Sequence, residues 1–364
     1  MNRPSSSIAA EAFVHVACVL LLSGCGRSEP GDAPSAARPG TLHAPSAVTA
    51  SASVTAAPPP AATTTAAPTS FAEPTPRTLA ALDAALFLDA PAGSADRLRT
   101  CAAEANPGHC LLGLRFTRDP AARAIAEDML DRFDSPAGVE RDHIMDGGYR
   151  GMIHILPRTP EGTNRTHLAW VRQTLDVFAT FFRDLRAAAG RAGPFPRYRT
   201  SHIDFRFMES ENRTTPSADA LDWRIGYNVK GSLLKSQDAV TETLFHEIFH
   251  LNDQAHDDYS VKKLTDVFEQ VRRKCGARTA CLAPYAPGDT MVRGGTYYAF
   301  QPGNDVREYA AELAVRYFRE QSAMLAKKAL AKPAFKCGPQ ENAMAFRLFV
   351  DEFFDGVDRT PACP

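Results

Sequence analysis

The sequence predicts an α+β fold that is rich in helices and contains a small mixed sheet. Several long segments carry apolar residues three and four positions apart, the spacing typical of amphipathic helices. Shorter runs alternate apolar and polar residues, which favours strands. We find no internal repeat. The 364 residues are 44% hydrophobic and 23% charged, which is enough for one large core or two small ones.

Residues 1–25 have the features of an export signal. Arg3 precedes an apolar run over residues 12–22, which has the length of a signal-peptide core and is too short to span a bilayer. The run ends in the sequence LSGC at residues 22–25, which resembles the bacterial lipobox, whose cysteine becomes the lipid-bearing first residue of the mature protein. We therefore expect an outer-membrane lipoprotein of the bacterial cell envelope, anchored through Cys25. A cleaved signal without a lipid, giving a secreted protein, is the alternative.

Residues 26–76 form a linker rich in Ala, Pro and Thr. Large apolar residues are rare in it, so burial cannot offset the entropy that the chain would lose on ordering. We expect a disordered tether, stiffened by proline, that holds the folded part away from the membrane. The folded part is expected to comprise a helical N-terminal part over residues 77–190 and a second domain over residues 191–364.

The elements of the folded part follow in order. A short apolar helix is predicted over residues 78–88, and a second over residues 119–133, with Pro120 in its first turn. Residues 166–189 are expected to form a long helix, because their apolar residues make one buried stripe. The remaining predicted helices cover residues 241–253, 260–273, 305–330 and 341–354, and the predicted strands cover residues 149–156, 202–208 and 223–229.

The eight cysteines indicate an oxidising compartment. Two fall in the N-terminal segment, and the other six form three close sets with no C-x-x-C spacing of a zinc site. Short loops favour pairing between neighbours, and the first pair is then expected to close a loop. The predicted disulfides are Cys101–Cys110, Cys275–Cys281 and Cys337–Cys363.

The charge balance excludes some classes of partner. Lys and Arg number 41 and Asp and Glu number 42, a net charge of -1. Nucleic acids and anionic membrane surfaces attract proteins with a strong basic excess. We therefore expect no nucleic-acid partner, and membrane contact only through a lipid on Cys25.

The strongest chemical motif is HEIFH at residues 246–250. Two histidines four apart on a helix project from one face, so both imidazoles can bind one ion while the glutamate lies beside them. This is the HExxH zinc pattern, with His246 and His250 as candidate ligands and Glu247 as the candidate general base. The alternative is a helix that carries two histidines and a surface glutamate by chance.

A third ligand is needed, because zinc in a hydrolytic site commonly takes three protein ligands and keeps one position for water. His256 follows His250 at the spacing of the long HExxHxxGxxH motif, but Asp253 replaces the glycine that lets the chain turn back to the metal. If the helix continues instead, His256 points away. The other candidate is Glu308, which precedes Glu312 by one helical turn. One carboxylate could bind zinc while the other accepts a hydrogen bond from a ligating imidazole.

Three segments resemble the catalytic domain of anthrax lethal factor and the related secreted clostridial proline-specific endopeptidases. They are HEIFHLND at residues 246–253, KKLTDVF at residues 262–268 and REYAAELAVRYF at residues 307–318. The resemblance covers about residues 223–318, and with it we expect a zincin-like catalytic domain over residues 191–364. In that family an acidic residue stands where Asp253 is, and the first glutamate of an E-x-x-A-E helix is the third zinc ligand. The resemblance therefore implies Glu308 as the ligand, with Glu312 and Asp253 supporting the ligands.

The resemblance also implies a chemistry. Glu247 would take a proton from the attacking water, and Tyr298 or Tyr297 would hydrogen-bond the developing oxyanion. The strand over residues 223–229 would be the sheet edge to which an extended peptide adds. The expected function is that of a zinc metalloendopeptidase acting on a protein or peptide substrate. The alternative from another class is a cell-surface lipoprotein whose zinc site is structural or vestigial and which acts by binding.

Overall fold

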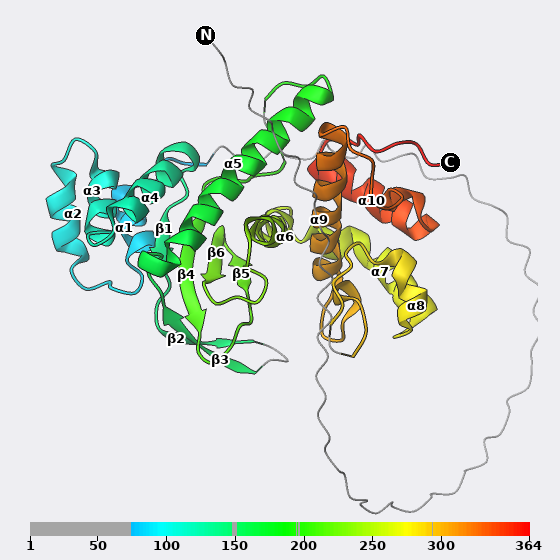
Figure 1. Cartoon of the computed structure of the whole chain (residues 1–364), viewed down its shortest axis with the longest axis horizontal. Helices are drawn as coiled ribbons and strands as arrows, with labels where there is room; N and C mark the ends of the chain where they lie inside the picture. Colours follow the sequence, from blue (N-terminus) through cyan, green and yellow to red (C-terminus); the bar gives the residue numbers. More distant parts are fainter. Residues whose placement is uncertain (1–73, 148–150, 194, 196, 293) are drawn as a thin grey trace, which may run out of the picture. The chain divides into compact units, whose positions relative to one another are not determined.

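The computed structural model describes residues 74–147, 151–193, 195, 197–292 and 294–364 (Figure 1). The predicted export signal with Cys25 lies outside the described residues, as does the predicted linker up to residue 73. Within the described residues the chain forms a mixed α+β fold with ten α-helices and one six-stranded sheet, which confirms the predicted fold class.

The sheet is mixed, with the strand order β2-β3-β4-β6-β5 and with β1 beside the first half of β4. β4 runs parallel to β1 and β6 and antiparallel to β3, and β5 is antiparallel to β6. β5 is therefore an edge strand. The bounds are β1 Ala137–Val139, β2 His143–Asp146, β3 Met152–Pro157, β4 Asp204–Ser210, β5 Ala218–Leu221 and β6 Arg224–Asn228.

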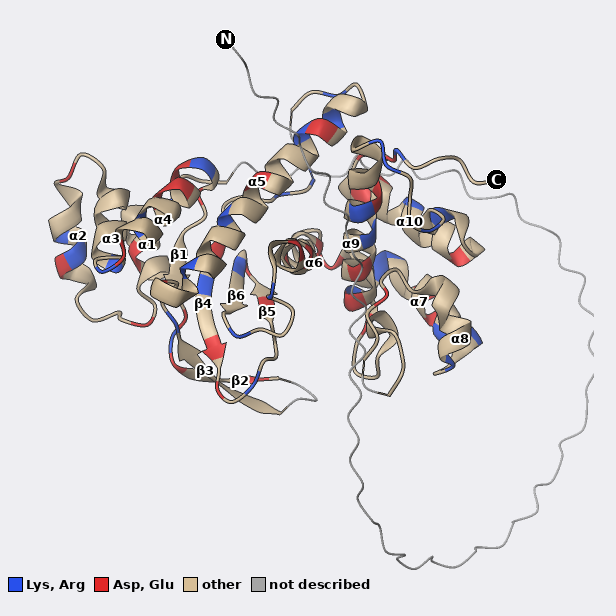
Figure 2. Cartoon of the chain, viewed as in Figure 1, with Lys and Arg blue, Asp and Glu red and all other residues tan. Residues whose placement is uncertain are grey.

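The helices lie on both sides of this sheet, with those before residue 134 on the left in Figure 1 and those after residue 236 on the right. Figure 2 shows acidic and basic residues interspersed along most of them, as expected for helices with one face in solvent. The bounds are α1 Leu79–Leu86, α2 Ser94–Ala102, α3 Pro107–Arg115, α4 Pro120–Phe133, α5 Arg165–Ala188, α6 Gln237–Ala255, α7 Tyr259–Cys275, α8 Thr279–Leu282, α9 Val306–Leu325 and α10 Gln340–Phe353, with short 3₁₀ turns η2 Gly162–Asn164, η3 Ala283–Tyr285, η4 Tyr298–Phe300 and η5 Phe335–Cys337.

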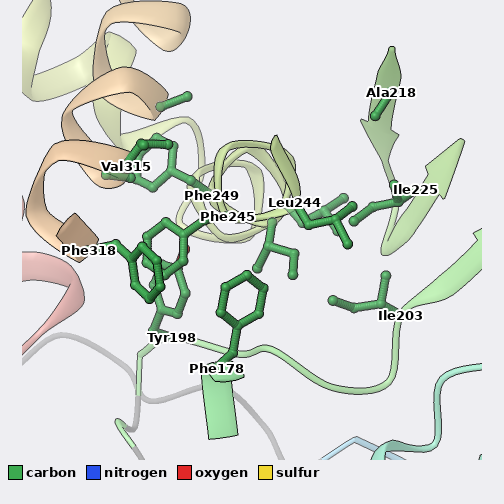
Figure 3. Packing of buried hydrophobic residues seen from close by; sticks show 14 of the residues in the cluster. Phe178, Tyr198, Ile203, Ala218, Ile225, Leu244, Phe245, Phe249, Val315 and Phe318 are labelled. Carbon is green, nitrogen blue, oxygen red and sulfur yellow. The ribbon is translucent and has the colours of Figure 1, made fainter. Parts of the chain in front are cut away.

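The core is built around α6, which is enclosed by the sheet, α5 and α9 (Figure 3). On one side Leu244 of α6 faces Ile225 of β6, and both are fully buried. On the other side the ring of Phe245 stacks on Phe318 of α9, with centroids 4.7 Å apart, and meets Phe178 of α5 edge-on at 5.4 Å. One hydrophobic cluster contains residues from both 77–190 and 191–364. Because these close-packed contacts fix the rotation of α6 about its axis, the orientation of its polar face is also fixed.

Several predicted boundaries need correction. The helix predicted over residues 305–330 ends at Leu325, because Lys327 adopts a left-handed conformation with φ of 53° and the Lys328 N–H returns to the carbonyl of Ala323. The strand predicted from residue 202 begins at Asp204, since His202 also has a left-handed φ of 58°. The strand predicted over residues 149–156 is described from Met152 and ends at Pro157.

The three predicted disulfides are confirmed, and they support the prediction of an oxidising compartment. Cys101 lies near the end of α2 and Cys110 lies in α3, so this bond ties two helices together. The loop that this pair closes is short, because α2 ends at Ala102 and α3 begins at Pro107. Among the described residues, no helix is both long enough and apolar enough to cross a bilayer.

The predicted edge strand over residues 223–229 is wrong in its place in the sheet. It forms β6, which pairs with β4 on one side and β5 on the other. β5 was not predicted, and a two-residue turn joins it to β6. Both turn residues, Asp222 and Trp223, have positive φ angles of 51° and 59°, as a tight hairpin of this length requires. The edge of the sheet beside α6 is therefore β5.

Candidate metal centre

The metal motif lies on α6, a helix with a defined start. The hydroxyl of Ser236 accepts a hydrogen bond from the backbone N–H of Ala239, and Asp238 lies in the first turn, where the helix dipole favours an acid. The buried residues Leu244, Phe245, Ile248 and Phe249 occupy one side of the helix. His246, Glu247 and His250 project from the other side and are only partly buried.

α9 supplies the acidic partners of this face. Its first turn is capped by Asp305, whose carboxylate accepts a hydrogen bond from the N–H of Arg307 at 2.8 Å. Glu242 of α6 pairs with Arg319, and His246 and His250 lie opposite Glu312 and Glu308. The order of these pairs shows that α6 and α9 pack antiparallel. Their register places carboxylates beside both imidazoles.

Three ligand atoms converge in a group that could hold a metal ion. Nε2 of His246 lies 3.1 Å from Nε2 of His250 and 3.1 Å from Oε2 of Glu308. Nε2 of His250 lies 3.7 Å from the other oxygen of Glu308. Two ligands bound tetrahedrally at about 2.0–2.1 Å from one ion are roughly 3.3 Å apart. The observed separations of 3.1–3.7 Å are close to this value, so the group could hold a metal ion.

Glu312 supports this arrangement from behind His246. Its Oε1 lies 3.6 Å from Nδ1 of His246, the ring nitrogen that faces away from the ligand group. A metal-ligating histidine usually donates its other N–H to a carboxylate, which sets the orientation of the ring. The structure thus places Glu308 in the group that could hold a metal and Glu312 3.6 Å from the other nitrogen of His246.

The charges of the group suit metal binding. Burial alone would raise the pKa of Glu308, but the hydrogen bond and charge of His246 lower it to about 2. Burial, together with the charge of His246, lowers the pKa of His250 to about 4. Glu308 is therefore anionic and His250 neutral at pH 7, the forms that bind a metal. Burial lowers the pKa of His246, but Glu308 and Glu312 outweigh it and hold that pKa well above its ordinary value, so a metal ion must displace a proton there.

His256 lies outside the group. α6 continues past Asp253 to Ala255, so the chain does not turn back toward the histidines. Nδ1 of His256 lies 2.7 Å from Glu352, and its Nε2 lies 2.9 Å from the carbonyl of Arg197. The alternative prediction, in which His256 is the third ligand, is therefore not what the structure shows. The group of three in the described part of the chain contains Glu308 instead.

Asp253 lies beside the site and caps the next helix. Its carboxylate accepts hydrogen bonds from the backbone N–H of Ser260 at 2.7 Å and from the Ser260 hydroxyl at 2.5 Å, at the start of α7. It also lines the cleft that contains the histidines. Its hydrogen bonds therefore connect the end of α6 to the start of α7.

The two candidate tyrosines have different positions. The hydroxyl of Tyr298 donates a hydrogen bond to Oε2 of Glu308 at 2.9 Å, and its ring lies 6.1 Å from that of His246. Tyr297 packs against the hydrophobic core and pairs through its backbone with Met291. Of the two, Tyr298 lines the cleft. No local sequence signal distinguishes adjacent tyrosines in an irregular segment, which is why the sequence left both open.

The metal group opens into a cleft of about 480 Å³. The floor is α6 with Glu247, one wall is β5, and the other wall is formed by Tyr298 and residues 303–308. Burial raises the pKa of Glu247 to about 8, and the charge of Glu308 adds to this effect while His246 opposes it. A larger groove of about 860 Å³ between α5 and the end of α9 is lined by none of the metal group, so the cleft at α6 is the candidate site.

β5 presents backbone groups to this cleft. The N–H of Asn228 donates to the carbonyl of Ser217, and hydrogen-bonded pairs alternate along an antiparallel ladder. Asp219 and Leu221 therefore bond inward to β6, while the backbone groups of Ala220 face the open edge. Sequence reasoning missed this strand, because it is only four residues long and its turn has no Asn-Gly or Asp-Gly signal.

Comparison with known protein families, characterised proteins and solved structures finds no match to this chain. The functional argument therefore rests on the residues of the site. Two predicted ligands on one helix and a third on a helix some sixty positions later meet within hydrogen-bond distance. Convergence over that sequence distance is much harder to obtain by chance than the HExxH pattern alone.

Glu308→Ala and His256→Ala should differ in metal binding. Glu308 belongs to the group that could hold a metal, so its loss should lower the affinity for added Zn²⁺ by more than about 100-fold, beyond the range for loss of an outer partner. His256→Ala should keep zinc, because both nitrogens of His256 bond elsewhere. Zinc affinity is measured by competition with a chelator, with a thermal melt as the folding control. Zinc retained in Glu308→Ala and lost in His256→Ala would contradict this assignment.

Proposed function

We propose that this protein is an exported zinc-dependent metallopeptidase. The observation that carries the proposal is the convergence of His246, His250 and Glu308 in a cleft that also holds Glu247 and is bordered by an edge strand. The three disulfides support a location in an oxidising compartment. A metal group, a proton carrier and a strand-binding edge in one cleft are the parts that peptide hydrolysis needs.

We propose zinc as the ion, because the two histidines have the HExxH spacing of zinc hydrolases. Two imidazole nitrogens and one carboxylate oxygen with a position left for water are the ligand set of hydrolytic zinc sites. A structural zinc site is normally closed by four protein ligands. The group found among the described residues has three, which favours catalysis over the alternative of a binding protein with a structural zinc site. When bound, zinc lowers the pKa of its water and polarises the scissile carbonyl.

Glu247 is proposed to carry the proton. It lies next to His246 in sequence and lines the same cleft, so its carboxylate is available to the attacking water. Without a metal, burial raises the pKa of Glu247 to about 8, and the positive charge of a bound ion would lower that pKa, so that Glu247 could accept a proton near neutral pH. In the proposed reaction, Glu247 accepts a proton from water and delivers it to the nitrogen of the leaving amine.

Tyr298 is proposed to stabilise the oxyanion. Its hydroxyl lies 2.9 Å from Glu308 and therefore stands at the edge of the metal group. A donor in this place can turn from the carboxylate to the carbonyl oxygen of a bound peptide as negative charge develops. Tyr297, which packs against the core, is not assigned a role in the reaction.

β5 is proposed to bind the substrate chain. The outward N–H and C=O of Ala220 can pair with an extended peptide, which then adds to the sheet as a further strand. Such pairing is independent of side chains, and it would place the peptide alongside His246, Glu247 and His250. A protein or peptide is the substrate class that uses this edge.

Glu247→Gln should abolish peptide cleavage and leave zinc bound at about one ion per chain, because the glutamate is not a ligand. Cleavage is followed with a mixed peptide library, and zinc is measured by elemental analysis of the same sample. Unchanged peptide cleavage by Glu247→Gln would contradict the proposed role of Glu247. A zinc-loaded wild-type protein that cleaves no library member would instead favour the binding protein.

Tyr298→Phe should lower kcat by about 100-fold or more, the usual effect of losing an oxyanion donor. Tyr297→Phe is the matched control, since it removes the same atom from the adjacent residue, and it should leave kcat within about twofold. Both variants are compared on one peptide at saturating substrate. An equal effect of the two substitutions, or a larger effect at Tyr297, would contradict the assignment.

Ala220→Pro should raise KM at least about tenfold, because proline removes the outward N–H with which the peptide pairs. Ala220→Ser is the control, since it keeps that N–H. Zinc content and the melting temperature should stay close to those of the wild type, because this N–H makes no bond to β6. A normal KM for a folded Ala220→Pro protein would rule out peptide binding at β5.

A further inference from the structure

Gly288 lies in the segment over residues 286–298, which follows η3 and ends at the first residue of η4, and this segment makes two contacts with the metal centre. Its end carries Tyr298, which donates to Glu308. Its middle carries Gly288, which is buried against Glu312. The disulfide Cys275–Cys281 closes the chain just before η3, and Lys332 pairs with Asp289 directly after Gly288 at 2.5 Å. Gly288 itself is buried, while the Lys332–Asp289 pair beside it is exposed.

The space beside Gly288 is filled by the carboxylate of Glu312. A Cβ built on Gly288 would lie 1.7 Å from Oε2 of Glu312 and 3.0 Å from its Cδ. Non-bonded atoms do not approach to 1.7 Å, so any side chain here must displace the carboxylate. The φ angle of Gly288 is not among the positive glycine φ angles, so alanine can adopt its backbone. What glycine supplies here is room, not backbone freedom.

Displacing that carboxylate affects His246. One oxygen of Glu312 lies beside Gly288, and the other lies 3.6 Å from Nδ1 of His246. A carboxylate is planar and rigid, so moving one oxygen moves the other. The side chain of Glu312 is flexible and can rotate away, so an added methyl group should cost more in the orientation of His246 than in folding.

We infer that Gly288 is a positioning residue of the metal centre. Because glycine has no side chain, it leaves the space that the Glu312 carboxylate occupies next to His246. This inference rests on the proposed zinc site. It assigns a role to the disulfide-tied segment between α7 and α9, which would orient the ligands from outside the ligand group as well as contributing Tyr298.

The test compares zinc affinity, by chelator competition, in the wild type and in Gly288→Ala, Glu312→Ala and the double variant. Gly288→Ala and Glu312→Ala should each weaken zinc binding by about 10–100-fold. The double variant should bind no more weakly than Glu312→Ala, because the methyl group then enters space that the carboxylate has left. Gly113→Ala is the matched control. Gly113 lies in α3, far from the metal group in sequence, and a Cβ on it would lie 3.0 Å from the guanidinium of Arg123. This variant should keep wild-type zinc affinity.

Wild-type affinity in Gly288→Ala, or losses that multiply in the double variant, would overturn the inference. If Gly288→Ala does not fold, the double variant should fold, since the clash is with Glu312, and an unfolded double variant would also overturn it. A wild-type protein that binds no zinc would overturn the proposed metal site itself. That outcome differs from tight zinc binding in the wild type with unchanged affinity in Gly288→Ala, which would overturn only the role of Gly288.

Discussion

The site depends on one contact, that of His246 on α6 with Glu308 and Glu312 on α9. These helices are far apart in the sequence, and they meet correctly only if their register is maintained. Stacking of Phe245 on Phe318 and the Glu242–Arg319 ion pair maintain it from the buried and exposed sides. A slip of one residue would rotate a helical side chain by about 100° and separate the imidazoles from the carboxylates. Packing and chemistry are therefore coupled at this interface.

The remaining parts of the cleft come from segments without regular periodicity. β5 contributes an open edge, and the segment around Gly288 and Tyr298 contributes a hydroxyl and a space of defined shape. Each is held by local backbone structure: a turn with two positive φ angles for β5, and the bridge between Met291 and Tyr297 for the second segment. The rigid helices thus position the ligands, while the irregular segments provide the groups that would meet a substrate.

The sequence predicts the parts of this arrangement that depend on local pattern. The HExxH helix, the Glu308–Glu312 spacing and the neighbouring cysteine pairs are local patterns. The structure brings His246, His250 and Glu308 together, and it joins the neighbouring cysteines in disulfides. The predictions that depend on tertiary contacts either left alternatives unresolved or were wrong. Only the fold shows that Tyr298, and not Tyr297, contacts Glu308. The sequence also does not show that β5 pairs with β6 and takes the edge position. Nor does it distinguish Gly288 from other loop glycines. Asp253 indicates that the helix continues, and its role as a cap of α7 is visible only in the fold.

The central claim is that one metal ion is bound by His246, His250 and Glu308. Anomalous diffraction at the zinc absorption edge, from crystals of the zinc-loaded protein, tests it most directly. The account predicts a single anomalous peak at about 2.0–2.2 Å from Nε2 of both histidines and from a carboxylate oxygen of Glu308. A peak coordinated by His256, or no peak between α6 and α9, would contradict it.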